Sequence, residues 1–321
     1  MIRRAITGLL LVAAFVLHAL VAQAQDFPNR TITIVVGLAA GGITDVTARL
    51  YGEALSKNIG QKVVIENRPG AGGAIGAAAV QNAKPDGYTV LIFSGSQHAT
   101  LPALQPAPYE PVKGFAPVSL LFNLVTLLVV PTDSPANSVA ELLALGKKKP
   151  GGLLFGSPGV GTPSHLLAVK IANATKTPMQ YVHYKGGAPM MADLITGRVD
   201  FGLASYTAAG SNIEGKKLKA IAIDADKRWA AMPNVPTLAE QGIKEKVASW
   251  FAVAAPAGTP PDIVKKLNAG FIKASRNPAL VKRLADNGTP IVTSTPEEMA
   301  KLLSAEVEQT AVLVRSLGLK K

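Results

Sequence analysis

The chain has 321 residues, of which 48% are hydrophobic and 17% charged, with 30 glycines, 23 prolines and no cysteine. This composition provides for a sizeable core and excludes a disordered or collagen-like chain. The lack of cysteine excludes disulfides, thiolate nucleophiles, zinc knuckles and iron–sulfur ligation.

The first 24 residues have the pattern of a secretory signal peptide. Arg3 and Arg4 precede an apolar stretch over residues 5–21, and Ala22-Gln23-Ala24 forms an A-x-A cleavage site. We predict cleavage near Ala24 and export to the periplasm, an oxidising compartment that suits a chain without cysteine. The alternative, an uncleaved membrane anchor, is less favoured because the apolar stretch is short for a bilayer span.

Without that segment, 31 basic residues stand against 21 acidic ones, a formal charge of +10. The basic residues are scattered, and the two runs at 147–149 and 216–217 stand at expected helix ends, where cations complement the helix dipole. No basic stretch is interleaved with aromatic residues, as single-strand binders require. We therefore predict no nucleic-acid partner and a solvated basic surface that attracts anions.

From residue 30 onward, strand patterns alternate with helical ones. Expected strands are apolar and β-branched over consecutive positions, as in strands buried on both faces. They cover residues 31–36, 63–66, 89–93, 153–155, 180–183, 199–203, 218–223 and 250–254. Expected helices cover residues 46–60, 74–83, 139–145, 164–173 and 189–196, and three more follow residue 260, one beginning at a capping-box-like Thr295–Glu298. This alternation indicates an α/β fold with parallel strands.

Two stretches interrupt the alternation. Residues 101–114 are rich in proline and expected to be irregular, whereas residues 116–130 form an apolar run that we interpret as one or two strands crossing between domains. The chain would then form two lobes, joined near residues 120–127 and again near 245–252. A cleft between two such lobes is where a small ligand binds.

Four glycine-rich turns stand between an expected strand and an expected helix. They cover residues 39–45, 69–73, 156–163 and 185–189, two in each lobe. Free N–H groups at a helix start, with the helix dipole behind them, bind anions. Taken singly, each turn is more simply explained as an ordinary connection. Thr162 has the place of an N-cap with Pro163 behind it, and Asp45 has the place of a first-turn acid.

Catalytic patterns are weak by comparison. The expected mature chain has three histidines, His98, His165 and His183, with no H-E-x-x-H motif and no G-x-S-x-G around any serine. A serine–histidine–aspartate triad assembled from distant positions remains an alternative, because its members need not be close in the chain. The turn at residues 70–76 is similar to a dinucleotide turn but lacks an acidic residue at the next strand end. We predict no metal and no cofactor.

Several motifs occur in one order along nearly the whole expected mature chain. They are Ile32-Thr33-Ile34-Val35-Val36 with Ala40-Gly41-Gly42, Glu66-Asn67-Arg68-Pro69-Gly70-Ala71-Gly72-Gly73, Pro85-Asp86-Gly87-Tyr88-Thr89, Gly161-Thr162 with His165-Leu166, Tyr184-Lys185-Gly186, Gly197-Arg198-Val199-Asp200, Pro233-Asn234-Val235-Pro236-Thr237-Leu238-Ala239-Glu240 and Ala255-Pro256-Ala257-Gly258-Thr259-Pro260. In these motifs the chain resembles the substrate-binding proteins of tripartite tricarboxylate transporters, the Bug-type periplasmic receptors.

The resemblance implies a two-lobed periplasmic-binding-protein fold, or Venus flytrap, whose lobes are mainly parallel sheets flanked by helices. Residues 25–123 and 250–321 would form the first lobe, and residues 124–249 the second. The C-terminal helices could pack on either lobe. The implied function is that of a monomeric receptor, without enzymatic activity, that closes on a small organic carboxylate and presents it to a membrane permease.

The resemblance also implies which residues hold the ligand. They are Ala39, Ala40, Gly41, Gly42, Thr44, Asp45, Ser94 and Ser96 in the first lobe, and Ser157, Gly161, Thr162, His165, Lys185, Gly186 and Ala188 in the second. Asp200 is a further candidate, with capping or orienting a loop as its alternative role. The chain departs from the family pattern at Gly37-Leu38-Ala39-Ala40, at Leu101-Pro102 and at Ser157-Pro158. The main rival hypothesis is an exported hydrolase that uses serine, histidine and aspartate, and a surface or adhesion module is less favoured.

Overall fold

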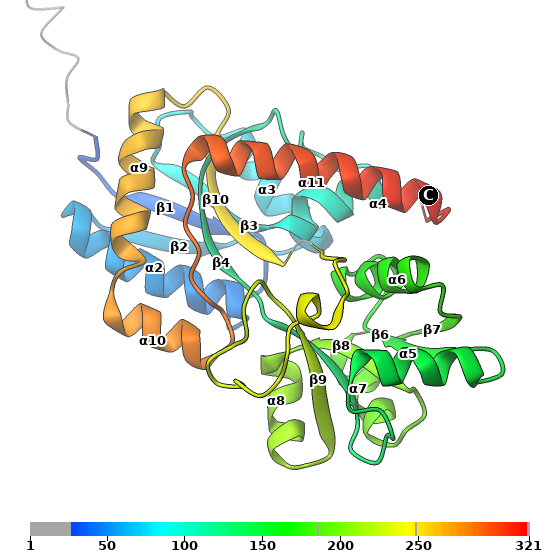
Figure 1. The fold of residues 1–321 in the computed structure, drawn as a ribbon. Coiled ribbons are helices and arrows are strands. Elements are labelled where there is room, and N and C mark those ends of the chain that lie inside the picture. Colours follow the sequence, from blue (N-terminus) through cyan, green and yellow to red (C-terminus); the bar gives the residue numbers. More distant parts are fainter. Residues whose placement is uncertain (1–26, 185, 248, 320–321) are drawn as a thin grey trace, which may run out of the picture.

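The computed structural model describes residues 27–184, 186–247 and 249–319, so the predicted signal peptide lies outside the described residues. The described chain forms two lobes, each a five-stranded sheet covered by helices (Figure 1). Among the described residues, no helix is both long enough and apolar enough to cross a bilayer.

The first lobe is built on a sheet with the strand order β2-β1-β3-β10-β4. These strands are β1 (Ile32–Val36), β2 (Val63–Asn67), β3 (Thr89–Ser94), β4 (Phe115–Asn123) and β10 (Trp250–Pro256). Helices α2 (Ile43–Ile59), α9 (Pro261–Ala274) and α10 (Pro278–Asp286) pack on one face, and α3 (Ala74–Gln81) and α11 (Pro296–Ser316) on the other. This double cover explains the continuous apolar pattern of β3, whose inner residues are fully buried.

The second lobe repeats this plan with the strand order β7-β6-β8-β5-β9. The strands are β5 (Thr126–Pro131), β6 (Leu153–Ser157), β7 (Met179–His183), β8 (Phe201–Ser205) and β9 (Leu218–Asp224). Helices α5 (Val139–Lys148) and α6 (Pro163–Thr175) cover one face, and α7 (Gly187–Ile195) and α8 (Tyr206–Glu214) the other.

Each sheet contains one strand that runs against its neighbours. Strand β10 is antiparallel to β3 and β4, and β5 is antiparallel to β8 and β9, while the other pairs are parallel. Both are the strands by which the chain enters one lobe from the other. They start where the parallel strands end and must run in the opposite direction. In each sheet four of the five strands therefore run in one direction, as expected of mainly parallel sheets, and the single reversed strand makes the sheet mixed.

Two crossings connect the lobes. Leu124 and Val125 link β4 to β5, so the apolar run over residues 116–130 contains two strands of different sheets. The Leu124 N–H donates to the carbonyl of Ser249 in the second crossing (2.9 Å), and the Val125 N–H donates to the carbonyl of Gly288 (2.9 Å). The segment after α10 is therefore also hydrogen-bonded to the first crossing.

All the predicted helices are present, and the described residues contain two further α-helices that were not predicted. Helix α8 has only a weak apolar period, and α4 (Leu101–Leu104) lies in the proline-rich stretch that we expected to be irregular. Helix α4 continues directly from the π-helical turn Ser96–Thr100. The capping box of α11 is confirmed: the Glu298 N–H donates to Thr295 Oγ1, and the Thr295 N–H donates to Glu298 Oε2.

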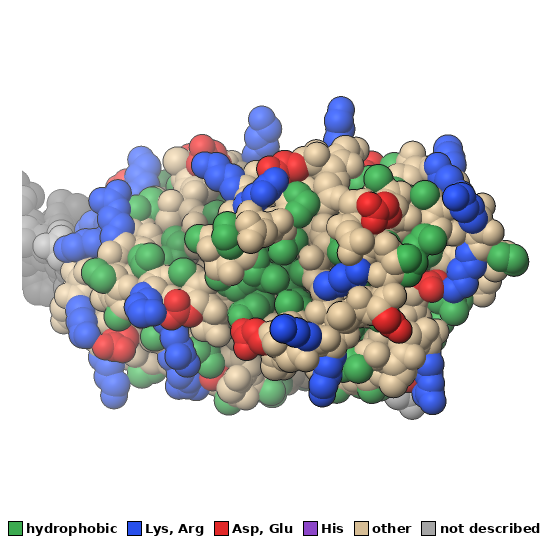
Figure 2. Space-filling model, turned by 60° about the horizontal axis from the view of Figure 1, so that its bottom comes forward, with side chains coloured by type: hydrophobic (Ala, Val, Ile, Leu, Met, Phe, Trp, Pro, Cys, Tyr) green, Lys and Arg blue, Asp and Glu red, His purple; other side chains and the backbone are tan. Residues whose placement is uncertain are grey.

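On the face shown in Figure 2, charge is distributed rather than gathered. Figure 2 shows one face on which lysine and arginine side chains are interspersed with acidic and apolar ones. Several cations are paired with acids, among them Arg30 with Asp86 and Arg228 with Glu240. This face therefore offers no continuous basic stripe of the kind that nucleic acids require.

Candidate ligand-binding site

Turns from both lobes meet at the carboxyl ends of the parallel strands. Leu104 of α4, in the first lobe, lies against Gly161 of the second lobe so closely that a Cβ on this glycine would stand 2.3 Å from Leu104 Cδ1. One helical turn earlier, Leu101 lies against Gly72 of the second glycine turn. Helix α4 therefore bridges a turn of the first lobe and a turn of the second. We call the glycine turns and the end of β3 the inter-lobe turns.

The first turn, before α2, is held by Asp45. Its buried carboxylate accepts from the Gly41 N–H (2.9 Å) and pairs with Arg49 (2.9 Å), which also donates to Asn67. Burial opposes ionisation, but hydrogen bonds from Arg49, Gly41 and Asn67 outweigh it and lower the pKa of Asp45. The buried carboxylate of Asp45 thus holds the turn in shape from its inner side.

The outer side of this turn remains exposed to solvent. Ala39, Ala40, Gly41 and Gly42 are exposed, and no side chain caps the start of α2 at Gly42. The first N–H groups of a helix have no partner within the helix. Since the helix dipole adds partial positive charge there, this turn can receive a carboxylate through its backbone. Thr44 lies buried in the first turn of the same helix.

The end of β3 adds two hydroxyl groups to the first lobe. Ser94 and Ser96 have their Oγ atoms 3.0 Å apart, and the N–H of Gln97 donates to Ser94 Oγ. The Gln97 amide is buried and donates to the carbonyl of Gly73 (2.8 Å), which ties this strand end to the second glycine turn. His98, which follows, is fully buried among aromatic rings and is not available to a ligand.

The third turn, before α6, is fixed by its own side chains. Thr162 caps the helix by accepting from the His165 N–H (3.3 Å) and donates to the Gly159 carbonyl (2.9 Å). Ser157 Oγ donates to the same carbonyl (2.8 Å). His165 Nδ1 accepts from the Gly161 N–H (3.0 Å). The shape of this turn is thereby held by hydrogen bonds within the turn itself.

His165 is a neutral donor rather than a cation. Burial lowers its pKa to about 4, and the neighbouring His183 contributes in the same direction. Because Nδ1 accepts a hydrogen bond, the neutral ring carries its proton on Nε2. In the described part of the chain, no serine hydroxyl hydrogen-bonds to a histidine ring, so the described hydrogen bonds do not assemble the serine–histidine pair that the hydrolase hypothesis needs.

The fourth turn, before α7, is linked to the third. The Gly186 N–H donates to the Pro158 carbonyl (3.0 Å), and the Tyr184 N–H donates to the Ser157 carbonyl (2.9 Å). Gly186 has a φ of 111°, which favours glycine, and Ala188 is exposed beside it. Lys185, the remaining predicted ligand residue of this turn, lies outside the described residues.

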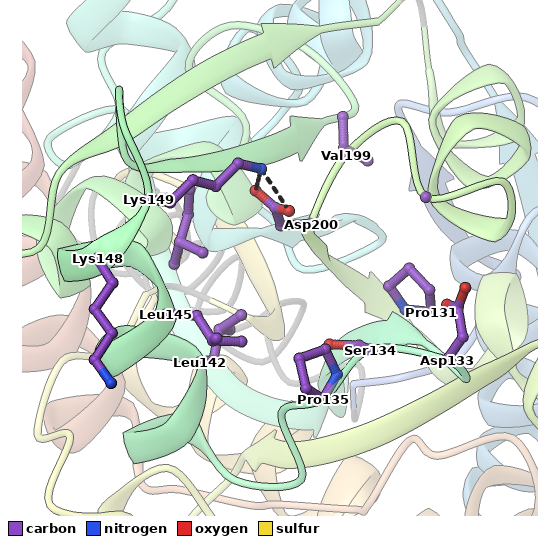
Figure 3. Close-up of a pocket in the computed structure, with 12 residues that line it drawn as sticks. Pro131, Asp133, Ser134, Pro135, Leu142, Leu145, Lys148, Lys149, Val199 and Asp200 are labelled. Atoms are coloured by element: carbon purple, nitrogen blue, oxygen red, sulfur yellow. Dashed lines mark hydrogen bonds and ion pairs between the residues drawn. The ribbon is translucent and has the colours of Figure 1, made fainter.

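Asp200 does not join the other candidates. It precedes β8 instead of following a parallel strand, so it lies at the opposite end of the second sheet from the inter-lobe turns. Its carboxylate pairs with Lys149 (2.7 Å) and accepts from the Leu154 N–H (2.7 Å), at the rim of a hollow of about 490 Å³ beside α5 (Figure 3). Its role in the structure is to orient Lys149 and the start of β6.

Three residues near the inter-lobe turns are not predicted from the sequence. Leu101 and Leu104 lie in the stretch expected to be irregular but are helical and bridge the two lobes, and the buried amide of Gln97 donates to Gly73. The apolar spacing of the two leucines, three residues apart, was the available signal.

The inter-lobe turns, on two α/β lobes joined by crossing strands, define a two-lobed solute-binding protein. The profile of the tripartite tricarboxylate transporter family receptor matches residues 47–319. The chain belongs to this family, which confirms the predicted resemblance.

Individual relatives agree with this membership. The UPF0065 protein in the tcbD-tcbE intergenic region of Pseudomonas sp. (strain P51) is 37% identical over 315 residues, or 97% of this chain and 93% of that protein. The solved periplasmic binding protein BugD is 33% identical with a TM-score of 0.71, over 92% of this chain and 100% of that one. A Rhodopseudomonas palustris protein solved with adipate is 33% identical with a TM-score of 0.74, over 91% and 99%. These solved relatives share the two-lobed α/β fold.

Proposed function

We propose that this protein is an exported receptor that captures a small organic carboxylate between its two lobes and delivers it to a tripartite tricarboxylate-type permease. The observation that carries the proposal is the contact of α4 with Gly161, because it brings helix-start turns of both lobes to one place. Membership of a receptor family and the adipate seen in a relative support a carboxylate ligand. The same membership supports binding without turnover.

The proposed site has two halves. The first consists of Ala39, Ala40, Gly41, Gly42, Thr44, Ser94 and Ser96, and the second of Ser157, Gly161, Thr162, His165, Lys185, Gly186 and Ala188. Asp45 supports the first half from inside the turn, and we leave Asp200 out. Backbone N–H groups at the start of α2 would neutralise the carboxylate without a formal ion pair, which allows binding that is tight and still releasable. At the start of α6 the Ser164 N–H would join them, since Pro163 has no N–H and the His165 N–H donates to Thr162.

The proposed lobes divide at the two crossings. Residues 25–123 with 250–321 would move as one body and residues 124–249 as the other, with Leu124, Val125 and Ser249 in the hinge. A ligand that contacts both bodies favours the closed arrangement by its differential affinity for it. We propose a monomeric receptor in the periplasm, exported by residues 1–24.

A thermal-shift screen against mono-, di- and tricarboxylates, amino acids and aromatic acids tests the proposal. A ligand that binds only the folded state raises the unfolding midpoint in a concentration-dependent way. We expect one carboxylate to do so, with no product formed over time. If no acid shifts the midpoint, mass spectrometry of the supernatant after denaturation shows whether a ligand from the host is already bound. An empty supernatant, or a product released from an ester or amide, would contradict the receptor function.

A further inference from the structure

A hollow of about 490 Å³ opens in the second lobe, at the opposite end of the sheet from the inter-lobe turns (Figure 3). Helix α5 borders one side of it, and the segment after β5 borders the other. Leu142, Leu153 and Val199 line its inner part and are buried, whereas Leu145 and Pro135 at its sides are accessible to solvent. This α5 hollow can therefore receive an apolar group from outside the chain.

A fixed cation lies at the rim of the α5 hollow. Lys149 Nζ donates to both carboxylate oxygens of Asp200 (2.8 and 2.7 Å), and the Leu154 N–H donates to Asp200 Oδ2 (2.7 Å). A lysine ammonium has three donors, so one donor of Lys149 is left for a further acceptor. Lys148, which precedes it, also lines the hollow, is exposed, and has no acidic partner among the described residues.

The segments around the hollow carry more positive than negative charge. Seven lysine and arginine residues stand against three acidic ones over residues 131–149, 197–200 and 216–219. The third segment adjoins the hollow because Lys219 Nζ donates to the carbonyl of Ser134 (2.6 Å). Asp133 at the rim offsets only part of this charge. A second copy of this chain, with a formal charge of +12, would add like charge, so the hollow is complementary to an acidic partner.

The apolar side chains of this surface are recessed and do not project from it. The large apolar side chains that are exposed among the described residues are Leu38, Ile75, Val160, Val281 and Val312. None of these five lines the α5 hollow. Surfaces that enter a bilayer project apolar side chains outward. A recess beside cations suits instead a protein segment that brings its own protruding apolar side chain.

We propose that the α5 hollow binds an acidic segment of a partner protein, which places an apolar side chain in the hollow and carboxylates beside Lys148 and Lys149. An apolar anchor surrounded by polar contacts is the usual arrangement of a protein interface. The inference goes beyond the proposed carboxylate site, because the hollow lies at the other end of the second sheet.

Fluorescence anisotropy with a labelled peptide of alternating leucine and glutamate tests the proposal. We expect this peptide to bind the purified protein, and to bind more weakly as salt is added. A peptide of alternating serine and glutamate lacks the apolar groups, and a peptide of alternating leucine and lysine lacks the negative charge. Each should bind at least about tenfold more weakly.

The variant Lys148→Glu tests the charge contact. We expect it to weaken binding of the leucine–glutamate peptide about fivefold, because attraction at the rim becomes repulsion. Lys147→Glu is the matched control, since it makes the same change of net charge at an exposed neighbouring position that does not line the hollow. It should change the affinity by less than about twofold.

The variant Leu145→Ala tests the apolar contact. We expect it to weaken peptide binding about fivefold by removing part of the apolar surface that the anchor meets. Leu143→Ala is the matched control, because both leucines lie on α5 and are partly buried against the same core, and only Leu145 lines the hollow. It should leave the affinity unchanged, and urea unfolding shows that both variants are folded.

The outcomes are distinct from those of the proposed function, because all four variants should keep the thermal shift given by a carboxylate ligand. Peptide binding with losses confined to Lys148→Glu and Leu145→Ala supports the proposal. Failure of the leucine–glutamate peptide to bind at about 1 mM, or equal losses in the matched variants, overturns it. Binding to vesicles of phosphatidylcholine and phosphatidylglycerol that Lys148→Glu weakens, without peptide binding, overturns it in favour of a membrane surface.

Discussion

The side chain of Thr162 contributes both to the fold and to the proposed site. It caps α6 through the His165 N–H and also fixes the carbonyl of Gly159, so its hydroxyl contributes to the shape of the third turn. Ser138 caps α5 in the same way through the Glu141 N–H, on a helix that carries none of the proposed ligand residues. The two caps form a natural pair for separating stability from binding.

We predict that Thr162→Ala lowers both the stability of the protein and its ligand affinity. Loss of the cap costs about 1 kcal/mol, and loss of the Gly159 contact loosens the turn that presents N–H groups to the carboxylate. Ser138→Ala should cost a similar free energy and leave affinity unchanged. Urea unfolding measures the stability, and calorimetry with the carboxylate found by thermal shift measures the affinity. Unchanged affinity in Thr162→Ala would show that this residue is a cap alone.

Asp224 is a buried acid at the end of β9. It is 7% exposed, and its Oδ2 has no hydrogen-bond partner in the described structure. Burial raises its pKa to about 7; Asp226 acts in the same direction, while Lys246 and Lys170 oppose the shift. In the unfolded chain this carboxyl titrates near 3.8. Between these values the folded state holds a proton that the unfolded state has lost, so stability falls as pH rises through the window.

We predict that Asp224→Asn stabilises the protein at pH 8 by up to about 4 kcal/mol. The difference from the parent should shrink as pH falls and vanish near pH 4, where the carboxyl is protonated in both states. Urea midpoints at pH 4, 6 and 8 measure it, with the exposed Asp133→Asn as control. A difference that does not depend on pH would contradict an ionisation effect.

At the scale of elements, the contact between α4 and the α6 turn depends on a glycine. Gly161 has a φ of 71°, which favours glycine, and its missing Cβ leaves room for Leu104. Gly197 has nearly the same φ, 70°, but an added Cβ would meet nothing within 4 Å. Alanine substitutions at these two glycines therefore separate the effect of backbone strain from the effect of the contact between the lobes.

We predict that Gly197→Ala loses about 1 kcal/mol of stability through backbone strain, and that Gly161→Ala loses more, because its methyl group also meets Leu104. Gly161→Ala alone should lose ligand affinity. Its methyl group pushes α4 away from the turn. Adding Leu104→Ala to Gly161→Ala should restore part of the affinity by removing the clash. Calorimetry on the parent, the two glycine variants and the double variant measures ligand affinity. Equal affinities in the two glycine variants would contradict this prediction.

Most elements were predictable, and the exceptions have physical causes. Strands β1 and β3 are apolar on both faces, and α11 carries a full capping box, so local pattern and tertiary structure agree there. Helix α8 is composed mostly of polar and small residues, apart from Tyr206 and Ile213, and is held against β9 and α7 by packing. Its stability comes from its neighbours, which a single sequence does not show.

At the scale of the whole molecule, the two crossings and the segment after α10 connect the lobes. The hydrogen bonds from Leu124 and Val125 connect the first crossing to Ser249 in the second crossing and to Gly288 after α10. Such an arrangement permits a hinge, because few backbone groups have to change when one lobe rotates against the other.

We predict that the carboxylate ligand changes the distance between the lobes. Glu53→Cys on α2 and Lys216→Cys before β9 place spin labels at exposed positions of opposite lobes, and the native chain offers no competing thiol. Pulsed electron–electron double resonance (DEER) with and without the ligand should give distinct distributions of the distance between the two labels. As a control, Glu53→Cys with Lys265→Cys labels one lobe twice and should not respond. Identical distributions in the presence of saturating ligand would contradict closure.

The sequence by itself determined the alternation of strands and helices, the glycine turns and the family resemblance, because these depend on local pattern and on the order of motifs. Tertiary structure decided which turns meet. It reversed β5 and β10, since each enters a lobe from the other, and it placed Asp200 at the far end of its sheet, since that residue precedes its strand. It also set α4 between the lobes and buried the Asp45 carboxylate on the inner side of its turn. These outcomes depend on contacts between residues far apart in the chain, which no local pattern records.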